Sequence, residues 1–496
     1  MSILKKNVCT TEVLKILCLC VFLGIVSFLF LTKSPLHIWI GSDTGTDSSV
    51  FLTVAMMMDK GYMPYRDSFD HKGPLLFLID YVGRKIAVYR GVWLIEFISM
   101  FITLLFIYKI ARLKCSRILS CIVIMISLSL LFAFFKGGNL SEEYALPFIA
   151  GSLFVFLDYF INEKISAIRL ISCGLCFGGV CLLRPNMISL WVVFCIAVLI
   201  KCIRNKEFRE LRMFIILFLV GFFIIVFPII VWLALNHCLK DCWYASITFN
   251  FMYSSAASNF ERWSTFLVYF KEPTVIITTL ISGYMFFVSQ NRFLYGTYCC
   301  YLVCTFIFIC VAGRGYNHYG MILVPAVAFP VAFMFERCRE YFPVNKGRVE
   351  AFFLTAFFMC ISIIPAWYPV LVELPTIYEK RNEENNSGLV NEVCRIVSSN
   401  TRVDDKISVY GMWDIIYILS DRAHATKYGH QSSLRSTKPE IMQEYFEELK
   451  EEKPPIIVIQ KGQYDDEIET FLDENDYSLI WSEADNDTTM TLIYKR

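Results

Sequence analysis

Charged residues are scarce in this sequence of 496 residues. They make up 18% of the chain, whereas hydrophobic residues make up 56%, and the mean hydropathy is +0.52. A water-soluble domain carries about 25% charged residues. One soluble core cannot enclose so large an apolar excess, so many of these residues must face lipid. The sequence therefore predicts a polytopic membrane protein.

Three further absences narrow the function. The formal net charge is only +1, so the chain lacks the positive excess that would suggest a nucleic-acid partner. Its 19 cysteines include no C-x-x-C pairs repeated at metal-ligand spacing, and a zinc site is not predicted. The polar C-terminal part contains neither a Gly-rich phosphate loop nor a nucleophile elbow.

Eleven segments are apolar enough to be transmembrane helices. They are residues 16–32, 91–108, 118–135, 144–161, 170–183, 187–200, 213–235, 273–289, 293–312, 319–335 and 352–369. The fifth and sixth are short and meet at Arg184-Pro185-Asn186, which predicts a tight helical hairpin. Two other apolar stretches, 50–58 and 74–88, are too short to span, and we expect them to lie along the outer membrane surface.

Basic residues are concentrated in alternate loops of this pattern. If the N-terminus is cytoplasmic, the inner segments hold 17 Lys and Arg residues, whereas the short outer turns hold only Lys136, Arg184 and Arg314. Cytoplasmic loops of membrane proteins are enriched in Lys and Arg. The bias therefore predicts a multi-pass plasma-membrane protein with a cytoplasmic N-terminus. An odd number of spans then places the C-terminal part outside the cytoplasm.

The C-terminal part differs from the rest in charge and pattern. Residues 373–496 carry 25 acidic and 14 basic side chains, whereas the preceding residues carry 20 acidic and 32 basic. Runs at 406–410 and 455–460 predict strands, 477–481 and 489–494 predict a closing hairpin, and 437–440 form a capping box opening a helix. This alternation predicts a small extracytoplasmic α/β domain at 373–496, after a membrane domain at 1–372.

Polar and aromatic residues gather in the segments predicted to lie outside. The first outer loop, within 33–90, holds G-T-D-S-S-V-F around Asp47, then G-x-x-P-Y-R-D at 61–67 and D-H-K-G-P-L at 70–75. Later outer turns read K-G-G-N-L-S-E-E-Y, L-L-R-P-N and A-G-R-G-Y-N-H-Y. Polar side chains are costly near lipid, so their clustering on one side indicates a functional site there.

This set of motifs resembles the GT-C superfamily of polytopic glycosyltransferases, which use polyprenyl-phosphate sugars. The closest pattern is the family 39-like branch, with protein O-mannosyltransferases and lipid A aminoarabinose transferases. The match covers roughly residues 1–370. It rests on the Asp47 block, G-x-x-P-Y-R-D, D-H-K-G-P-L, in which Gly73 replaces the first proline of the family's K-P-P-L segment, and Glu142-Glu143-Tyr144, Arg184-Pro185 and His318-Tyr319.

The resemblance implies a GT-C-like membrane domain of about eleven helices and an inverting glycosyltransferase active on the outer face. Its donor would be a polyprenyl-phosphate-linked sugar, and its acceptor a lipid, polysaccharide or protein of the cell envelope. An acceptor hydroxyl has a pKa far above 7, so a carboxylate must take its proton. Asp47 is the candidate catalytic base and Asp43 its rival. The alternative is that either residue only caps the following helix.

Cations are needed to stabilise the charge on the leaving phosphate. Lys72 and Arg184 are the main candidates, and Arg314 with His318 forms a second pair. Lys72 reaching toward lipid headgroups and Arg184 compensating a helix end are the structural alternatives. Glu143 is the candidate for hydrogen bonds to sugar or acceptor hydroxyls, although a glutamate at a helix start also complements the helix dipole.

No cofactor is predicted. The spacing D-x-x-D-H at 67–71 is a weak metal signature, so a divalent cation is possible but not favoured. Two other function classes stay open. A transporter of lipid-linked sugars would need inverted repeats and charges at mid-membrane, whereas the charges here gather at outer helix ends. A non-catalytic glycan-binding membrane protein is opposed by the set Asp47, Lys72 and Arg184.

Overall fold

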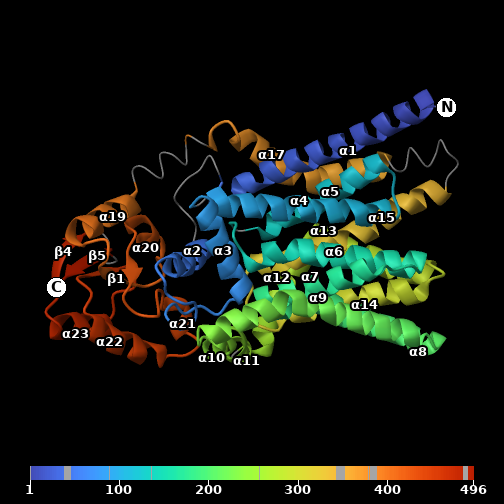
Figure 1. The fold of residues 1–496 in the computed structure, drawn as a ribbon. Helices are drawn as coiled ribbons and strands as arrows, with labels where there is room; N and C mark the ends of the chain where they lie inside the picture. Colours follow the sequence, from blue (N-terminus) through green and yellow to red (C-terminus); the bar gives the residue numbers. More distant parts are fainter. Residues whose placement is uncertain are drawn as a thin grey trace.

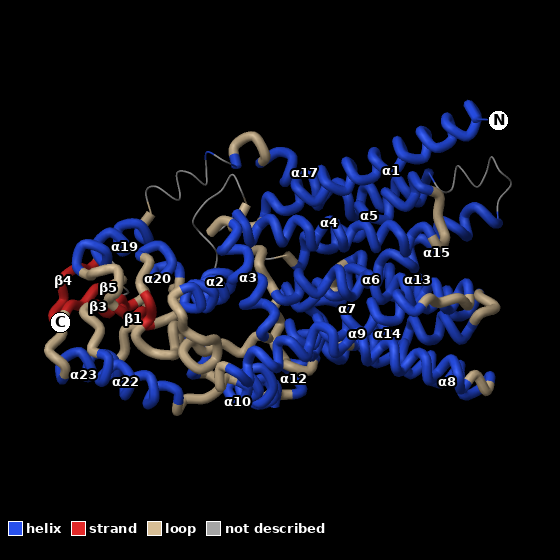
Figure 2. Tube along the Cα trace, viewed as in Figure 1, coloured by secondary structure: helices blue, strands red, loops and turns tan. Residues whose placement is uncertain are grey.

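The computed structural model describes residues 2–37, 46–88, 90–135, 137–255, 257–341, 352–377, 379, 388–483 and 490–496. A long bundle of roughly parallel and antiparallel helices makes up most of the chain, and a small domain covers one end of it (Figure 1). The N-terminus lies at the opposite end. Among the described residues, all named strands belong to the small domain (Figure 2). We call the two ends of the bundle the domain end and the far end.

Each of the eleven predicted spans coincides with a bundle helix. Eight helices of the described part are long and apolar enough to cross a membrane, and two shorter apolar helices join them. The chain is thus a polytopic α-helical membrane protein. The bundle helices are α1 Ser2–Phe30, α4 Arg90–Arg112, α5 Arg117–Phe134, α6 Ser141–Asn162, α7 Ala167–Leu183, α8 Ser189–Asn205, α9 Phe208–Leu235, α13 Pro273–Val288, α14 Arg292–Cys310, α15 Val324–Tyr341 and the segment Phe352–Glu373, which ends in α17 Ile364–Glu373.

The packing of α7 differs from the predicted hairpin. The turn between α7 and α8 is short, a single 3-10 turn at Pro185–Met187, but α7 packs mainly against α9 and α6 instead of α8. Glycines explain this. A Cβ on Gly174 would lie 1.9 Å from the carbonyl oxygen of Phe218, and one on Gly221 would lie 1.9 Å from that of Ile171. Such close backbone approach requires small residues, and these glycines bring α9 onto α7.

Short helices lie at the domain end of the bundle. Helices α2 (Thr46–Asp59) and α3 (Pro74–Ile86) lie between the bundle and the small domain, and they correspond to the stretches predicted to be too short to span (Figure 1). Three more follow α9, namely α10 Leu239–Trp243, α11 Asn250–Ser255 and α12 Asn259–Phe270. Helix α2 packs against α20 (Ile415–Ser420) of the small domain, whereas α12 packs against α13 and α14 of the bundle.

The small domain contains a five-stranded mixed sheet of order β2-β1-β3-β5-β4. Strands β1 Lys406–Tyr410, β2 Ala423–His424 and β3 Ile456–Ile459 are parallel, and β4 Ser478–Ser482 and β5 Leu492–Lys495 form the antiparallel hairpin predicted from the sequence. The helices are α19 Leu389–Asn400, α20 Ile415–Ser420, α21 Ser432–Arg435, α22 Ile441–Glu452 and α23 Asp466–Glu474. Strand β3 is the central strand of the sheet, between β1 and β5. All four of its residues are buried, which agrees with the continuous apolar run in the sequence.

The predicted capping box is wrong. Helix α22 begins at Ile441 with Glu440 as its N-cap and without a side-chain cap, and the hydroxyl of Thr437 has no hydrogen-bond partner. A Pro at 439 favours an extended residue before it, and the chain makes a separate turn before the helix starts. The helix itself is present where the sequence predicts it.

Candidate functional site

A cavity of about 240 Å³ lies where the domain end of the bundle meets the small domain. Residues from six separate segments line it, which places sequence-distant residues side by side. They are Asp47, Val50 and Phe51 of α2, Asp70, His71 and Lys72 of the following loop, Phe249 and Tyr253 near α11, Tyr316, His318 and Tyr319 before α15, and Met412, His430 and Ser433 of the small domain.

Helix α2 carries Asp47 into this cavity. The helix begins at Thr46, so Asp47 lies in its first turn, where unpaired backbone N–H groups favour a carboxylate. Val50 and Phe51, one turn later, are buried and line the same wall. Asp47 itself is only half-buried and faces open space. Its rival from the sequence, Asp43, lies outside the described residues.

The loop after α2 is held in one conformation by its own polar groups. Tyr65 has a left-handed backbone (φ 71°), and its hydroxyl donates to the carbonyl oxygen of Lys72 at 2.9 Å. The Asp70 carboxylate accepts from the backbone N–H of Lys72 at 2.8 Å, and the Asn250 amide donates to the carbonyl of His71 at 2.7 Å. These bonds turn three successive side chains, those of residues 70–72, toward the cavity.

Gly73 explains the departure from the family's K-P-P-L pattern. Its N–H donates to the carbonyl oxygen of Leu183 at 3.0 Å, a bond that proline cannot make. A Cβ at position 73 would lie 2.0 Å from the carbonyl oxygen of Leu182. The loop therefore touches the last turn of α7 directly. As a result Lys72 lies near Arg184, although 112 positions separate them in the sequence.

Burial shifts the pKa values of two side chains in this loop. Burial lowers the pKa of His71 well below its usual value, and the positive charges of Lys72, Arg184 and His430 lower it further. The neutral His71 ring can accept from the Lys72 ammonium group, whose Nζ lies 3.3 Å from Nε2. Burial also raises the pKa of Asp70, against the charges of Lys72 and His430. Lys72 is thus a cation that projects from a largely desolvated turn.

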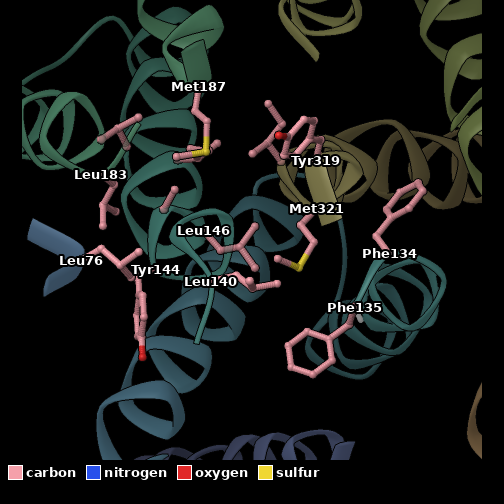
Figure 3. Packing of buried hydrophobic residues seen from close by; sticks show 14 of the residues in the cluster. Leu76, Phe134, Phe135, Leu140, Tyr144, Leu146, Leu183, Met187, Tyr319 and Met321 are labelled. Atoms are coloured by element: carbon pink, nitrogen blue, oxygen red, sulfur yellow. The ribbon is translucent and has the colours of Figure 1, made fainter. Parts of the chain in front are cut away.

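Arg184 lies behind the cavity wall. Its guanidinium group forms a buried ion pair with Glu142 at the start of α6, and it lies 3.9 Å from the ring centroid of Tyr319. Ser141 donates to the other carboxylate oxygen of Glu142 at 2.9 Å. Arg184 therefore supports the cavity through Tyr319. Figure 3 shows Tyr319 facing Met187, with Leu183 and Leu146 close to the same core.

His318 and Arg314 approach the cavity from the segment before α15. The His318 ring stacks on Tyr316, with ring centroids 5.7 Å apart and planes only 8° apart. The Arg314 guanidinium lies 4.8 Å from the ring centroid of Tyr253, and its Nε is buried without a hydrogen-bond partner. Tyr253 and Tyr316 line the cavity, so both basic residues contribute to one aromatic wall.

Glu143 does not line the cavity. It belongs instead to a second set of buried polar residues, which we call the closed cluster: Asp80, Glu96, Asn139, Glu143 and Tyr144. The Asn139 amide donates to Asp80 at 3.0 Å and to Ser48 at 3.2 Å, its N–H donates to Glu96 and Glu143, and its side-chain oxygen accepts from Tyr144. We call the other set, Asp47, Asp70, Lys72, His318 and the Glu142–Arg184 pair, the cavity cluster.

The small domain supplies cavity residues that the sequence analysis did not identify. His430, Met412 and Ser433 line the cavity, and Asp414 lies beside His430. One signal existed in the sequence, because two of the six histidines of the chain fall within the segment 423–430 of an otherwise acidic domain. Nothing in the sequence indicated that this segment would face the loop that carries Asp70.

The triad Asp67, Asp70 and His71, considered above as possible metal ligands, is divided by the fold. Asp67 accepts from the N–H of Met63 at 2.7 Å and pairs with Arg66, so it stabilises the loop. Asp70 and His71 face the cavity without it. Over the ranges that the structure describes, no group of three or more His, Cys, Asp or Glu residues is arranged to hold a metal ion.

The chain is similar to one protein family and to solved structures. The family model for the competence-induced protein Ccs4 N-terminal domain matches residues 5–338. ArnT from Cupriavidus metallidurans has the same fold. Its crystal structure bound to undecaprenyl phosphate has a TM-score of 0.60, 11% identity and coverage of 96% of this chain and 97% of its own. Its apo crystal structure has a TM-score of 0.54, 11% identity and coverage of 97% and 98%. No curated protein matches by sequence. The similarity confirms the predicted GT-C fold.

Proposed function

The chain belongs to the family of the competence-induced protein Ccs4 N-terminal domain, and since it also has the ArnT fold, we propose that it is an inverting membrane glycosyltransferase. It would move one sugar from a polyprenyl-phosphate donor to a hydroxyl of a lipid, polysaccharide or protein of the cell envelope. The reaction would take place in the cavity at the domain end of the bundle.

The chemistry is a single displacement at the anomeric carbon. The acceptor oxygen forms a bond to that carbon while the bond to the phosphate oxygen breaks, and the polyprenyl phosphate leaves with the electron pair. Asp47 takes the acceptor proton, which suits a half-buried carboxylate at a helix N-terminus that opens onto the cavity. Positioned general-base help is worth about 10²–10⁴-fold in rate.

The phosphate would be held by the basic residues at the cavity. Lys72 and His318 line the cavity directly, Arg314 contacts Tyr253, and Arg184 lies behind Tyr319. A lysine is a compact point charge that can follow the phosphate as charge builds on the leaving oxygen. Because Glu142 pairs with Arg184, that arginine mainly orients Tyr319 in the structure.

The lipid tail would reach the cavity from the side. Around α10–α12, large apolar side chains are exposed next to the cavity segments: Trp243, Phe251, Phe260, Trp263 and Leu267. In water such a surface would be costly, whereas at a membrane interface aromatic side chains are favoured. A polyprenyl chain lying in the bilayer could therefore present its phosphate to Lys72 without leaving the lipid.

The sidedness of the site is part of the proposal. The turns after α4, α6 and α8 lie at the far end with the N-terminus, because successive helices alternate in direction. With the helix ends beside them they hold ten of the 17 Lys and Arg residues that the sequence analysis assigns to inner segments. Basic loops favour the cytoplasm. The cavity and the small domain would then face outward, where a flipped lipid-linked sugar is present and nucleotide sugars are absent.

The observation that carries the proposal is that one cavity brings together a half-buried carboxylate, Asp47, and a basic side chain, Lys72. The test is Asp47→Asn in the full-length protein, in membranes supplied with labelled polyprenyl-phosphate sugars. We expect turnover to fall about 10²–10⁴-fold with no change in the amount of folded protein. Retained turnover would reject Asp47 as the base.

Asp404→Asn is the matched control, because Asp404 is an exposed carboxylate of the small domain that does not line the cavity. It should leave turnover unchanged. If the wild-type protein instead moves lipid-linked sugar across vesicles without forming a transfer product, the transporter class replaces this proposal. Analysis of envelope glycans in a deletion strain would identify the sugar through a truncated glycan and accumulated donor.

A further inference from the structure

The small domain places one ionisable side chain in the cavity, His430. The residue follows β2 and precedes α21, and its side chain is 3% exposed. A buried histidine at the edge of a cavity is commonly either a packed ring or a group with a charge-dependent role. The contacts of its two ring nitrogens decide between these possibilities.

Each ring nitrogen of His430 faces a different carboxylate. Nε2 lies 3.8 Å from an oxygen of Asp70, which belongs to the loop after α2. Nδ1 lies 3.8 Å from an oxygen of Asp414, which belongs to the small domain. Asp414 is buried, and its other oxygen has no hydrogen-bond partner. A neutral ring carries a proton on one nitrogen only, whereas an imidazolium ion presents N–H groups and positive charge to both carboxylates, at ion-pair distances of 3.8 Å.

Asp70 connects His430 to the reacting part of the cavity. Its other oxygen accepts from the N–H of Lys72 and fixes the turn from which Lys72 projects. A change at His430 would therefore be transmitted through Asp70 to the backbone of Lys72. In this way a residue of the small domain can affect the position of Lys72.

We propose that His430 is a positioning residue for transfer: as an imidazolium ion it binds Asp70 and Asp414 together and holds the 70–72 turn in its working position. The role in transfer rests on the function proposed above. The structural role does not, because it concerns only the conformation of the turn.

The surroundings favour the charged form of His430. Burial opposes the charge, but the hydrogen-bonding and negative charge of Asp414 and the charges of Asp70 and Asp47 raise its pKa above the ordinary value. The two histidines that face it oppose its charge little, because burial lowers the pKa values of His71 and His424 and favours their neutral forms. The facing titratable groups are thus Asp47, Asp70, His71, Asp414 and His424. The bridge should be lost as pH rises through this raised pKa.

Other contacts hold the small domain in place without His430. Ser68 donates to Nε2 of His424 at 2.9 Å, and the N–H of Phe69 donates to the carbonyl of Lys427 at 2.7 Å. Thr53 of α2 donates to the carbonyl of Asp414, and Lys60 pairs with Asp421 at 2.9 Å. A variant at position 430 should therefore fold and keep its domain docked, which makes the proposal testable.

The experiment compares the wild type with His430→Gln, an uncharged side chain of similar reach, in the full-length protein in detergent or nanodiscs. Displacement of a catalytic turn by about 1 Å can lower a rate about 10²-fold, so we expect kcat to fall about 10- to 100-fold. The wild-type rate should decline on the alkaline side as the imidazolium loses its proton. H430Q should lack this decline. His430→Lys, which keeps a positive charge, should recover part of the rate and move the decline to higher pH.

A second measurement does not depend on activity. Hydrogen exchange of the 63–73 segment should quicken in the wild type as pH rises through the His430 pKa, after correction for the intrinsic pH dependence of exchange. It should be fast at all pH values in H430Q. His237→Gln is the control, because His237 is an exposed histidine outside the cavity and should match the wild type. If transfer is absent from the wild type but the exchange pattern is found, the proposed function fails and the positioning role stands. If H430Q matches the wild type in exchange and in pH profile, the inference is overturned.

Discussion

Two neighbouring glutamates at the start of α6 enter different environments. Glu142 belongs to the cavity cluster, where it pairs with Arg184 behind Tyr319. Glu143 belongs to the closed cluster, where it meets Asn139 and Glu96, and no Lys or Arg of the described residues forms an ion pair with it. Successive helical residues point about 100° apart, so one helix end can serve both clusters.

The comparison shows that burial of polar groups alone does not define a reaction site. Both clusters contain buried carboxyl groups, but only the cavity cluster combines carboxylates, basic residues, aromatic rings and space for a ligand. The closed cluster uses its polar groups to join Ser34, which follows α1, to residues of α2, α3, α4 and α6. We therefore expect changes in the cavity cluster to affect transfer and changes in the closed cluster to affect mainly stability.

Among the variants that distinguish the two clusters, Glu142→Gln should cause the largest loss of stability and of transfer. It removes the charge that compensates the buried guanidinium of Arg184, and loss of one partner of a buried pair costs about 3–5 kcal/mol. We expect a lower thermal unfolding temperature in detergent together with loss of transfer, because Tyr319 loses its support. Glu143→Gln is the matched control and should keep transfer. The reverse result would move the functional glutamate to the closed cluster and favour the role suggested for Glu143 by the sequence.

Gly73→Ala should come next. The added Cβ would meet the carbonyl of Leu182 at 2.0 Å, so the turn carrying Lys72 must shift. We expect transfer to fall about 10²-fold, as for other displacements of about 1 Å, together with weaker binding of undecaprenyl phosphate by the purified protein. Gly61→Ala tests whether the loss is local, because position 61 has open space around it, although its φ of 90° adds some strain. Equal losses in both variants would contradict the importance of the contact with α7.

Asn139→Ala should have the smallest effect and a different kind. It removes the amide that bonds Asp80 and Ser48 and leaves these buried groups unpaired, which costs about 1–3 kcal/mol for each group left unsatisfied. We expect a lower unfolding temperature. Turnover of the folded fraction should fall only a few-fold, because the variant affects Asp47 only indirectly, through its neighbour Ser48 in the first turn of α2. Turnover per folded molecule measured beside the melting curve separates the two effects. A loss as large as that of Asp47→Asn would show that the closed cluster takes part in the chemistry.

Much of the fold was predictable because its signals are local. Long apolar segments predict membrane helices from composition alone, and the strand at Ile456–Ile459 is a continuous apolar run. The site required more. The sequence places Asp47, Lys72, Arg184 and His318 in separate loops, and the resemblance to GT-C transferases, not their spacing, grouped them before the structure did.

Three features were not predictable for physical reasons. The choice between Glu142 and Glu143 depends on the rotation of α6 about its axis, which neighbouring helices set. The packing of α7 on α9 depends on glycines in two helices that match only in three dimensions. The contribution of His430 depends on how the small domain is seated on the loop after α2, a long-range contact that no local pattern records.

The loop from Ser68 to Gly73 is bonded on one side to Lys427 and His424 of the small domain and on the other to Leu183 of α7. The C-terminal domain is therefore not an independent module. In a chimaera that joins this bundle to the domain of a relative, the two parts of the cavity lining would not match. Only hybrids in which the first loop and the domain are transplanted together should retain the specificity of their parent.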